Sequence, residues 1–380
     1  MKKYFTKENY PEKSKEKFEF VQMGDIKDER FKTEPIGFWK DSLNRFVRNK
    51  ASVIAFFNIS VIIIMAIIGP WMNEYEYNMQ NVALINMPPR IPGLERLGIA
   101  NGSLSLPNRR LANLDNPEIF PPGSIISVSN HRVIMNVDMV DVIVNDYIMR
   151  GVPDRYHWFG TDFLGRDIWT RLWRSARTSL LMAFLATAIN VSIGLLYGSI
   201  AGYYGGASDM VMMRFAELLE SIPSLIVMIM IIMFFGISVM TLILAFILTG
   251  WIGTAWTIRA QFFRYKNREY VLAARTLGVK DRKLIFRHIL PNGIGPIVTR
   301  AMIMVPGVMF GEAFLSYLGL GLRPPDTSIG VMLADGQRTL LTLPHQVLFP
   351  AVLISILMIS FNLFANGLRE ALDPTRRGEI

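Results

Sequence analysis

The sequence predicts an all-α polytopic membrane protein with six transmembrane helices. Of its 380 residues, 51% are hydrophobic, and they gather in stretches without any charged residue at 51–69, 179–204 and 222–258. A helix crosses the hydrocarbon core of a bilayer with about 20 consecutive apolar residues. Lysines and arginines cluster between these stretches, as is typical of cytoplasmic segments. We expect both termini in the cytoplasm and a long extracytoplasmic insert between helices one and two.

The composition also excludes several classes of enzyme and binding protein. The chain has no Cys and four His, and no two of these histidines have the spacing of metal ligands. It contains no Gly-x-x-x-x-Gly-Lys-Ser/Thr sequence, so it cannot hold ATP phosphates in a P-loop. We therefore expect no catalytic residue, metal or cofactor, and a chain that is not itself an enzyme. The net charge of +9 is explained by cytoplasmic loops that meet anionic lipid, so nucleic acid is not an expected partner.

The N-terminal part of the chain predicts a tail followed by one membrane helix. Residues 1–39 are polar, with interleaved Lys and Glu, which is typical of a cytoplasmic tail. The first transmembrane helix is expected over 40–71, where basic residues precede the uncharged stretch and Pro70 and Trp71 close it. Basic residues before a first span place the N-terminus in the cytoplasm.

Residues 72–174 form a long polar region rich in Pro and Gly, and we expect it outside the membrane. Within it, β-branched residues alternate in short bursts over 124–148, which predicts a few strands. Arg174 at the end of this region and Arg177 just after it run against the positive-inside rule. That rule is weak for long translocated loops, so the predicted orientation is kept.

Residues 175–368 are predicted to hold the other five transmembrane helices. The second of the six spans covers 179–204 and carries Gly194, Gly198 and Gly202 at four-residue spacing. Glycines on one helix face let a second backbone approach closely, so these three are candidates for helix packing. The alternative is a chance run of small residues.

The uncharged stretch 222–258 must contain the bulk of two spans. As one helix it would be roughly 55 Å long, against a hydrocarbon core of about 30 Å. The turn between the third and fourth spans is expected at 235–238, which reads Phe-Gly-Ile-Ser. The third span then begins near Met213, where Arg214 and Glu217 are three residues apart and can form an ion pair.

The fifth and sixth spans are expected over 292–317 and 347–367, with residues 369–380 as a cytoplasmic tail. The fifth contains Arg300 and Glu312, about 18 Å apart along a helix and too distant to pair. Ionisable groups at such depth face a bundle interior or a water-filled path. Both residues are therefore candidates for a translocation path; for Glu312 the alternative is a structural hydrogen bond to a neighbouring helix.

Residues 268–291 form a basic amphipathic segment between the fourth and fifth spans. From Phe262 to Leu290 the chain has eight Lys or Arg and two acidic residues, so this loop is expected in the cytoplasm. Helix formers from Glu269 to Leu277 are followed by Gly278, a natural helix stop, and Asp281 then favours a new helix start. The pattern predicts two short helices broken at a glycine.

At this loop the chain resembles the inner-membrane permeases of ABC importers. Their signature is Glu-Ala-Ala, three residues, Gly, nine residues, then Ile-x-Leu-Pro. Ala273, Ala274, Gly278, Leu290 and Pro291 stand at matching positions. The resemblance implies that this loop couples the permease to its ATPase.

Two positions depart from that signature. Leu272 replaces the Glu and His288 replaces the Ile. The family's Glu can form a salt bridge to the ATPase, and the nearby Glu269 is the candidate to substitute for it here. Small side chains at the two alanines keep one helix face shallow enough to enter a groove.

Three further segments narrow the resemblance to the oligopeptide/dipeptide/nickel branch and its C-type permease. They are Phe-Gly-Thr-Asp-Phe-Leu-Gly-Arg-Asp at 159–167, Leu-Ser-Tyr-Leu-Gly-Leu-Gly-Leu at 315–322, and Leu-Arg-Glu-Ala-Leu-Asp-Pro at 368–374. The resemblance implies the type I importer permease fold in the bacterial plasma membrane. It also implies a second, B-type permease, two cytoplasmic ATP-binding subunits, an external substrate-binding protein and a peptide substrate, besides the surrounding membrane lipid.

Other functions were weighed against peptide import. A nickel or other small-solute importer is the alternative within the family, and the lack of a His cluster favours peptide. A secondary transporter would need inverted repeats and acidic coupling sites at mid-membrane, and the sequence shows no repeat. An intramembrane protease would need a facing nucleophile and base, which the spans do not suggest. The insert, roughly 75–157, is expected to fold outside the membrane and help dock the binding protein.

Overall fold

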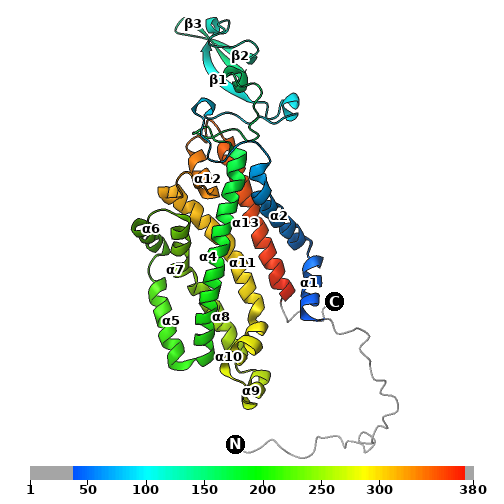
Figure 1. The fold of residues 1–380 in the computed structure, drawn as a ribbon, viewed down its shortest axis with the longest axis vertical. Coiled ribbons are helices and arrows are strands. Elements are labelled where there is room, and N and C mark those ends of the chain that lie inside the picture. The colour runs from blue at the N-terminus through cyan, green and yellow to red at the C-terminus, as the bar shows by residue number, and fades with distance from the viewer. Residues whose placement is uncertain (1–36, 373–380) are drawn as a thin grey trace, which may run out of the picture. The chain divides into compact units, whose positions relative to one another are not determined.

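The computed structural model describes residues 37–372, and this part of the chain is predominantly helical (Figure 1). The predicted tail 1–39 lies almost wholly outside the described residues, as does most of the predicted tail 369–380. Residues up to Asp41 form a unit separate from the rest, so the packing below concerns residues 42–372. Among residues 37–372, five helices are long and apolar enough to cross a membrane, and a bent pair makes a sixth if it counts as one span.

Several of the longer helices of the described chain contribute to one apolar core. The longer helices are α1 (Phe38–Arg48), α2 (Lys50–Ile68), α4 (Ile168–Tyr204), α5 (Gly206–Glu220), α6 (Ser224–Phe235), α7 (Val239–Gly250), α8 (Ile252–Tyr265), α11 (Ile294–Leu315), α12 (Ile329–Gln337) and α13 (His345–Leu372). The short helices are α3 (Asp146–Met149), α9 (Glu269–Thr276) and α10 (Asp281–Lys283). The strands are β1 (Ser103–Arg110), β2 (Ile125–Ile134) and β3 (Val137–Asn145).

The first predicted span is two helices rather than one. α1 ends at Arg48 and α2 begins at Lys50, because Asn49 is extended and its side chain caps α2 by accepting from the Ser52 backbone N–H. The uncharged stretch 51–69 corresponds to α2, which passes into a 3₁₀ turn over Gly69–Trp71. An N-cap of this kind satisfies a backbone donor that the helix itself leaves free.

The third predicted span is a bent pair, not the single helix expected from Met213. α5 and α6 meet at an angle of 74° across a break between Glu220 and Ser224. Pro223 lies in this break, and a proline has no N–H to continue a helix. The predicted turn at 235–238 is confirmed: α6 ends at Phe235, Gly236 adopts φ +75°, and α7 starts at Val239.

α4 is 37 residues long and begins eleven residues before the predicted start of the second span. Asp167 starts it by accepting from the Thr170 N–H. The unexpected arginines of the preceding region therefore belong to this helix. Arg177 donates to the carbonyls of Ala66 and Ile67 at 2.9 and 2.8 Å, which satisfies oxygens that the end of α2 leaves free.

The fifth span starts earlier than predicted, because the second short helix of the loop runs directly into it. α10 continues as a π-helical turn over Leu284–Ile289 and a 3₁₀ turn over Leu290–Gly293, and α11 follows without a loop. Pro291 interrupts the regular hydrogen-bond ladder here. The π-helical turn before Pro291 and the 3₁₀ turn that contains it use other hydrogen-bond spacings. The chain therefore stays helical from α10 into α11 despite the missing hydrogen bond.

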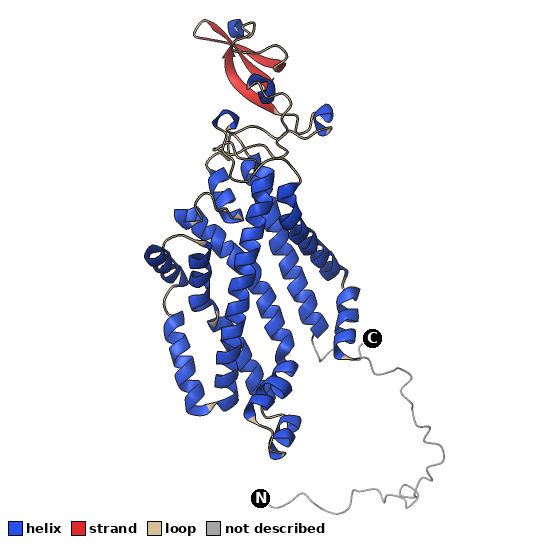
Figure 2. Ribbon diagram, in the orientation of Figure 1, coloured by secondary structure: helices blue, strands red, loops and turns tan. Residues whose placement is uncertain are grey.

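All strands of the described chain lie in one antiparallel sheet of order β1-β3-β2. The sheet is formed by the part of the chain that connects α2 to α4, and it lies beyond one end of the helices (Figure 2). The strands predicted within 124–148 are confirmed as β2 and β3. β1 was not predicted, because Pro107 and three polar residues after it break the alternation, and its register shifts at that point. Val140, Val142 and Val144 of the central strand are buried and form the sheet's own small core with Phe120.

The insert and the α9–α10 region lie at opposite ends of α4 (Figure 1). At the first end, Trp169 donates to the carbonyl of Gly69, where α2 leads into the insert. At the other end, the Tyr203 hydroxyl donates to Asp281 at the start of α10. A helix of 37 residues rises about 55 Å, so α4 connects the two regions across the whole bundle.

Gly194, Gly198 and Gly202 of α4 face α8. A Cβ added at Gly198 would lie 2.4 Å from the carbonyl oxygen of Ala255, and one at Gly202 would lie 2.6 Å from the Cβ of Phe262. At Gly194 it would meet the Thr254 side chain at 2.7 Å. Real Cβ atoms do not come this close, so the two helices can pack in this way only with glycine at these positions.

Replacing Gly198 by Ala should destabilise the protein by about 1–3 kcal/mol, because the added methyl overpacks a backbone contact that cannot yield. Gly307→Ala in α11 is the matched control, since a Cβ there meets nothing within 4 Å. Both changes gain the same helix propensity. Thermal unfolding of the purified protein in detergent should show a lower midpoint for Gly198→Ala only; equal midpoints would contradict the packing role.

Candidate functional site

The segment from Arg268 to Gly293 is built as a helix, a glycine turn and a second helical run. Helix α9 ends in a Schellman motif: the Val279 N–H bonds the Ala274 carbonyl at 3.2 Å, and the Gly278 N–H bonds that of Arg275 at 3.0 Å. Gly278 adopts φ +78°, the left-handed conformation that this motif requires and that glycine adopts without strain. The predicted helix stop at Gly278 is confirmed.

The inner face of this segment packs on the ends of the long helices. Its buried residues share one apolar cluster with α4, α8 and α11: Val271, Ala274, Leu284, Ile285 and Ile289 from the segment, and Tyr203, Ile258, Phe262 and Ile297 from the long helices. Val271 and Leu284 have no exposed surface. The segment is therefore a rigid part of the bundle end and not a loose loop.

Polar contacts hold the same segment to the end of α4. The Tyr203 hydroxyl donates to Oδ1 of Asp281 at 2.5 Å, and the Arg275 guanidinium lies over the Tyr203 ring at 5.5 Å. Lys266 Nζ donates to the Gly202 carbonyl at 2.9 Å, and burial lowers the pKa of this ammonium below its ordinary value. These contacts connect the α9–α10 region directly to the end of α4.

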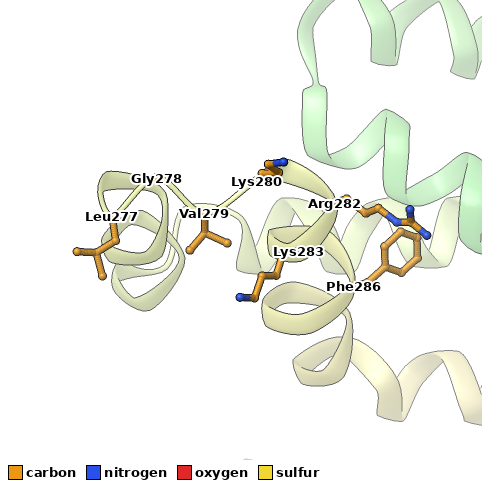
Figure 3. A pocket seen from close by; sticks show the side chains of 7 residues that line it. All are labelled: Leu277, Gly278, Val279, Lys280, Arg282, Lys283 and Phe286. Atoms are coloured by element: carbon orange, nitrogen blue, oxygen red, sulfur yellow. The ribbon is translucent and has the colours of Figure 1, made fainter.

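The outer face of the segment carries an open pocket with a volume of about 790 Å³ and a basic and apolar lining (Figure 3). We call it the outer groove; it is lined by Leu277, Gly278, Val279, Lys280, Arg282, Lys283 and Phe286. Leu277 is 84% exposed and points away from the turn, while Arg282 and Phe286 lie beside each other on the second helical run (Figure 3). Exposed apolar side chains, here Leu277 and Phe286, that are bordered by charged residues are typical of a protein interaction surface.

The residues predicted for this site fall on both faces of the segment. Glu269, Leu272 and Ala273 are exposed on α9, as is Pro291 after α10. Ala274 is 8% exposed and faces inward, and Leu290 packs against the inner apolar cluster. The Glu269 carboxylate forms no hydrogen bond or ion pair within residues 37–372.

Arg300 and Glu312, the two charges of the fifth span, have different surroundings. Arg300 is exposed and lines a cleft of about 490 Å³ between α4, α6, α7, α8 and α11. Glu312 is 2% exposed and accepts hydrogen bonds from Ser316 at 2.7 Å, Ser328 at 2.5 Å and Ser179 at 3.5 Å. This carboxylate joins α4, α11 and the start of α12. A role for either residue in translocation stays a prediction.

A buried charge network near the start of α4 was not predicted from the sequence. Asp162 is ion-paired with Arg166 and Arg171, and Asp335 of α12 lies 3.7 Å from Arg171. The acidic and basic residues of 159–167 belong to a sequence motif, but no sequence signal connects them to Asp335. The network fastens the base of the insert to α4 and α12.

Comparison with known proteins decides the family. Residues 194–378 match the family "Binding-protein-dependent transport system inner membrane component", and residues 37–89 match "N-terminal TM domain of oligopeptide transport permease C". The oligopeptide transport system permease protein OppC of Bacillus subtilis (strain 168) is 36% identical over 349 residues, which cover 92% of this chain and 93% of that protein. The chain belongs to this permease family.

The chain is also similar to a second permease and, more weakly, to a solved transporter structure. The dipeptide transport system permease protein DppC of the same Bacillus strain is 45% identical over 227 residues, covering 59% of this chain and 71% of that permease. Among solved structures, the MetNI methionine ABC transporter in an inward-facing conformation is 16% identical with a TM-score of 0.42, over 52% of this chain and 96% of that chain. The resemblance seen in the sequence is confirmed, and the permease is not itself an enzyme.

Replacing Gly278 by Val should loosen the α9–α10 turn, because a β-branched side chain at positive φ costs about 1–2 kcal/mol. Gly278→Asn is the control, since Asn tolerates this conformation. Nothing lies within 4 Å of an added Cβ, so neither change introduces a clash. Limited trypsin digestion should cut Gly278→Val faster between Arg268 and Arg287 and leave Gly278→Asn near wild type; equal rates would show that the turn does not depend on glycine.

Proposed function

We propose that this permease is the C-type subunit of an ATP-driven ABC importer of oligopeptides or dipeptides in the bacterial plasma membrane. It forms half of the translocation path, and a B-type permease forms the other half. The named activities of its relatives support peptide as the substrate, since they are called oligopeptide and dipeptide transport permeases. A nickel importer has no comparable support, and within residues 37–372 no three His, Cys, Asp or Glu side chains are grouped to hold a metal.

The outer groove is the observation that carries this proposal. It combines a strongly exposed Leu277 with the positive charges of Lys280, Arg282 and Lys283, on a segment packed into the bundle end. The chain has no P-loop, so an ATPase must bind from outside. We assign the segment 268–291 as its docking element, with Glu269, Leu272 and Ala273 on the contacting face and two ATP-binding subunits per importer. Gly278 shapes the turn, while Ala274, Leu290 and Pro291 set its position on the bundle.

The opposite end of α4 is proposed to face outside the cell. The basic loop 262–290 and the basic residues before α2 then lie in the cytoplasm with both termini, as the positive-inside rule favours. The bent pair α5–α6 counts as the third of six spans. In this orientation the sheet is extracytoplasmic and lies where a substrate-binding protein delivers peptide.

The sheet is proposed to help dock that binding protein. Nine of the ten residues of its edge strand β2 are exposed, among them Val128 at 46% and Val133 at 65%, and Met135 of the following turn is 96% exposed. An edge strand with exposed apolar side chains offers both backbone and side-chain contacts to a partner.

Purification of the complex from native membranes tests the assembly. We expect a second permease and ATP-binding subunits to be recovered with the wild-type chain. Gly278→Val should recover less ATPase and lose peptide uptake while its membrane insertion stays normal, and Gly278→Asn should behave nearly as wild type. Recovery of the wild-type chain without any ATPase would contradict the proposed function.

Removing the sheet tests its role separately. Ser103 and Asn145 are cross-strand partners, so residues 104–144 can be replaced by a short Gly-Ser linker without separating the flanking backbone. We expect weaker binding-protein docking and slower uptake, with ATPase recovery unchanged. A matched change of Val128 and Val133 to Thr keeps the fold and removes only apolar surface. Unchanged uptake in both variants would contradict a docking role.

A further inference from the structure

Arg300 has no partner within the part of the chain that the structure describes. Its guanidinium forms no ion pair or hydrogen bond among residues 37–372, although it belongs to a helix apolar enough to cross a membrane. The other deep charge of that helix, Glu312, accepts three hydrogen bonds. An unpaired arginine in a membrane helix is costly unless it faces a polar cavity. Arg300 is exposed and lines a cleft, so its guanidinium is accessible to a ligand there.

The neighbouring helix leaves room for this guanidinium. A Cβ at Gly253 of α8 would lie 2.3 Å from Nη2 of Arg300, so any larger residue would displace the end of the side chain. Glu220 lines the same cleft, but its carboxylate accepts from Trp256 Nε1 at 3.3 Å. Glu220 is the only acidic side chain among the residues that line the cleft, and it forms no ion pair with Arg300 in this structure.

An apolar stripe extends from Arg300 along one face of α11. Met304, Gly307, Val308 and Gly311 line the cleft at helical spacing from the arginine, and Met228 and Phe246 face them. Residues 300–311 cover about 16 Å of helix axis, the length of roughly four to five extended peptide residues. Methionines adapt to side chains of different shape, which suits a path for varied peptides.

We propose that Arg300 binds the terminal carboxylate of the peptide during transport, while the peptide body lies along the stripe toward Gly311. The inference rests on the proposed function and names the chemical group that the path recognises. A guanidinium binds a carboxylate through two parallel hydrogen bonds, whereas a C-terminal amide offers neither the charge nor the second acceptor oxygen. The path then selects for free carboxyl termini independently of the binding protein.

Uptake of tetra-alanine and of tetra-alanine amide by the whole importer tests this. The ratio of the uptake rates of free and amidated peptide is measured for the wild type and for Arg300→Gln, with the same binding protein in both. Dividing the wild-type ratio by the variant ratio gives a double ratio, from which the binding protein's own preference cancels. We expect this double ratio to be about tenfold or more, the low end for a hydrogen bond to a charged group. Arg300→Lys should fall between, because it keeps the charge without the fork.

Two further variants make the test specific. Gly253→Ala should also lower the ratio of free to amidated peptide uptake, because its methyl group displaces the guanidinium of Arg300. Alanine favours the helix, so this variant can replace Arg300→Gln in the test if Arg300→Gln does not assemble. Arg214→Gln removes an exposed arginine that pairs with Glu217 outside the cleft, and it should keep the wild-type ratio.

The outcomes are distinguishable from failure of the proposed function. If the wild-type importer moves neither these tetrapeptides nor di-alanine, the proposed function is wrong and this inference falls with it. If it moves both and Arg300→Gln slows them equally, Arg300 pairs with a carboxylate of the second permease or with a lipid phosphate, and the inference alone is overturned. A wild-type ratio that Arg300→Gln and Gly253→Ala leave unchanged overturns it too.

Discussion

The close contact between α4 and α8 is the interaction on which both ends of the molecule depend. Gly198 lies so near the Ala255 carbonyl that a Cβ would be 2.4 Å from it, and this allows two backbones to pack without intervening side chains. In a bilayer such packing replaces the hydrophobic effect as the main force between helices. Because α4 is 37 residues long, one tightly held helix connects the base of the insert to the α9–α10 segment.

The second constraint is that polar groups in a membrane must find partners within the protein. Arg177 satisfies free carbonyls at the end of α2, Arg171 pairs with Asp162, and Glu312 accepts from three serines. These charges join helices to one another. Arg300 differs from them because the described chain offers it no partner. The paired charges have a structural role, whereas Arg300 is available to a ligand or a second subunit.

The α9–α10 segment combines a fixed inner face with an open outer face. Burial of Val271 and Leu284 and the Tyr203–Asp281 hydrogen bond hold it to α4. The outer groove leaves Leu277 and three cationic side chains exposed. A partner bound there would therefore push on the long helices directly, and no flexible linker would absorb the movement.

The sequence by itself determined that this is a helical membrane protein, and it placed the turn at 235–238, the strands β2 and β3 and the helix break at Gly278. It could do so because hydropathy, periodicity and the conformational freedom of glycine are local properties. It also identified the permease family through the spacing of Ala273, Ala274, Gly278, Leu290 and Pro291. Only the tertiary structure decided that the third span bends at Pro223, that α10 runs on into α11, and that α4 begins at Ile168. Only the structure showed that Glu312 has hydrogen-bond partners whereas Arg300 has none within the described residues. The partners of Glu312 include Ser179 and Ser328, which are distant in sequence, and local sequence patterns do not predict such contacts.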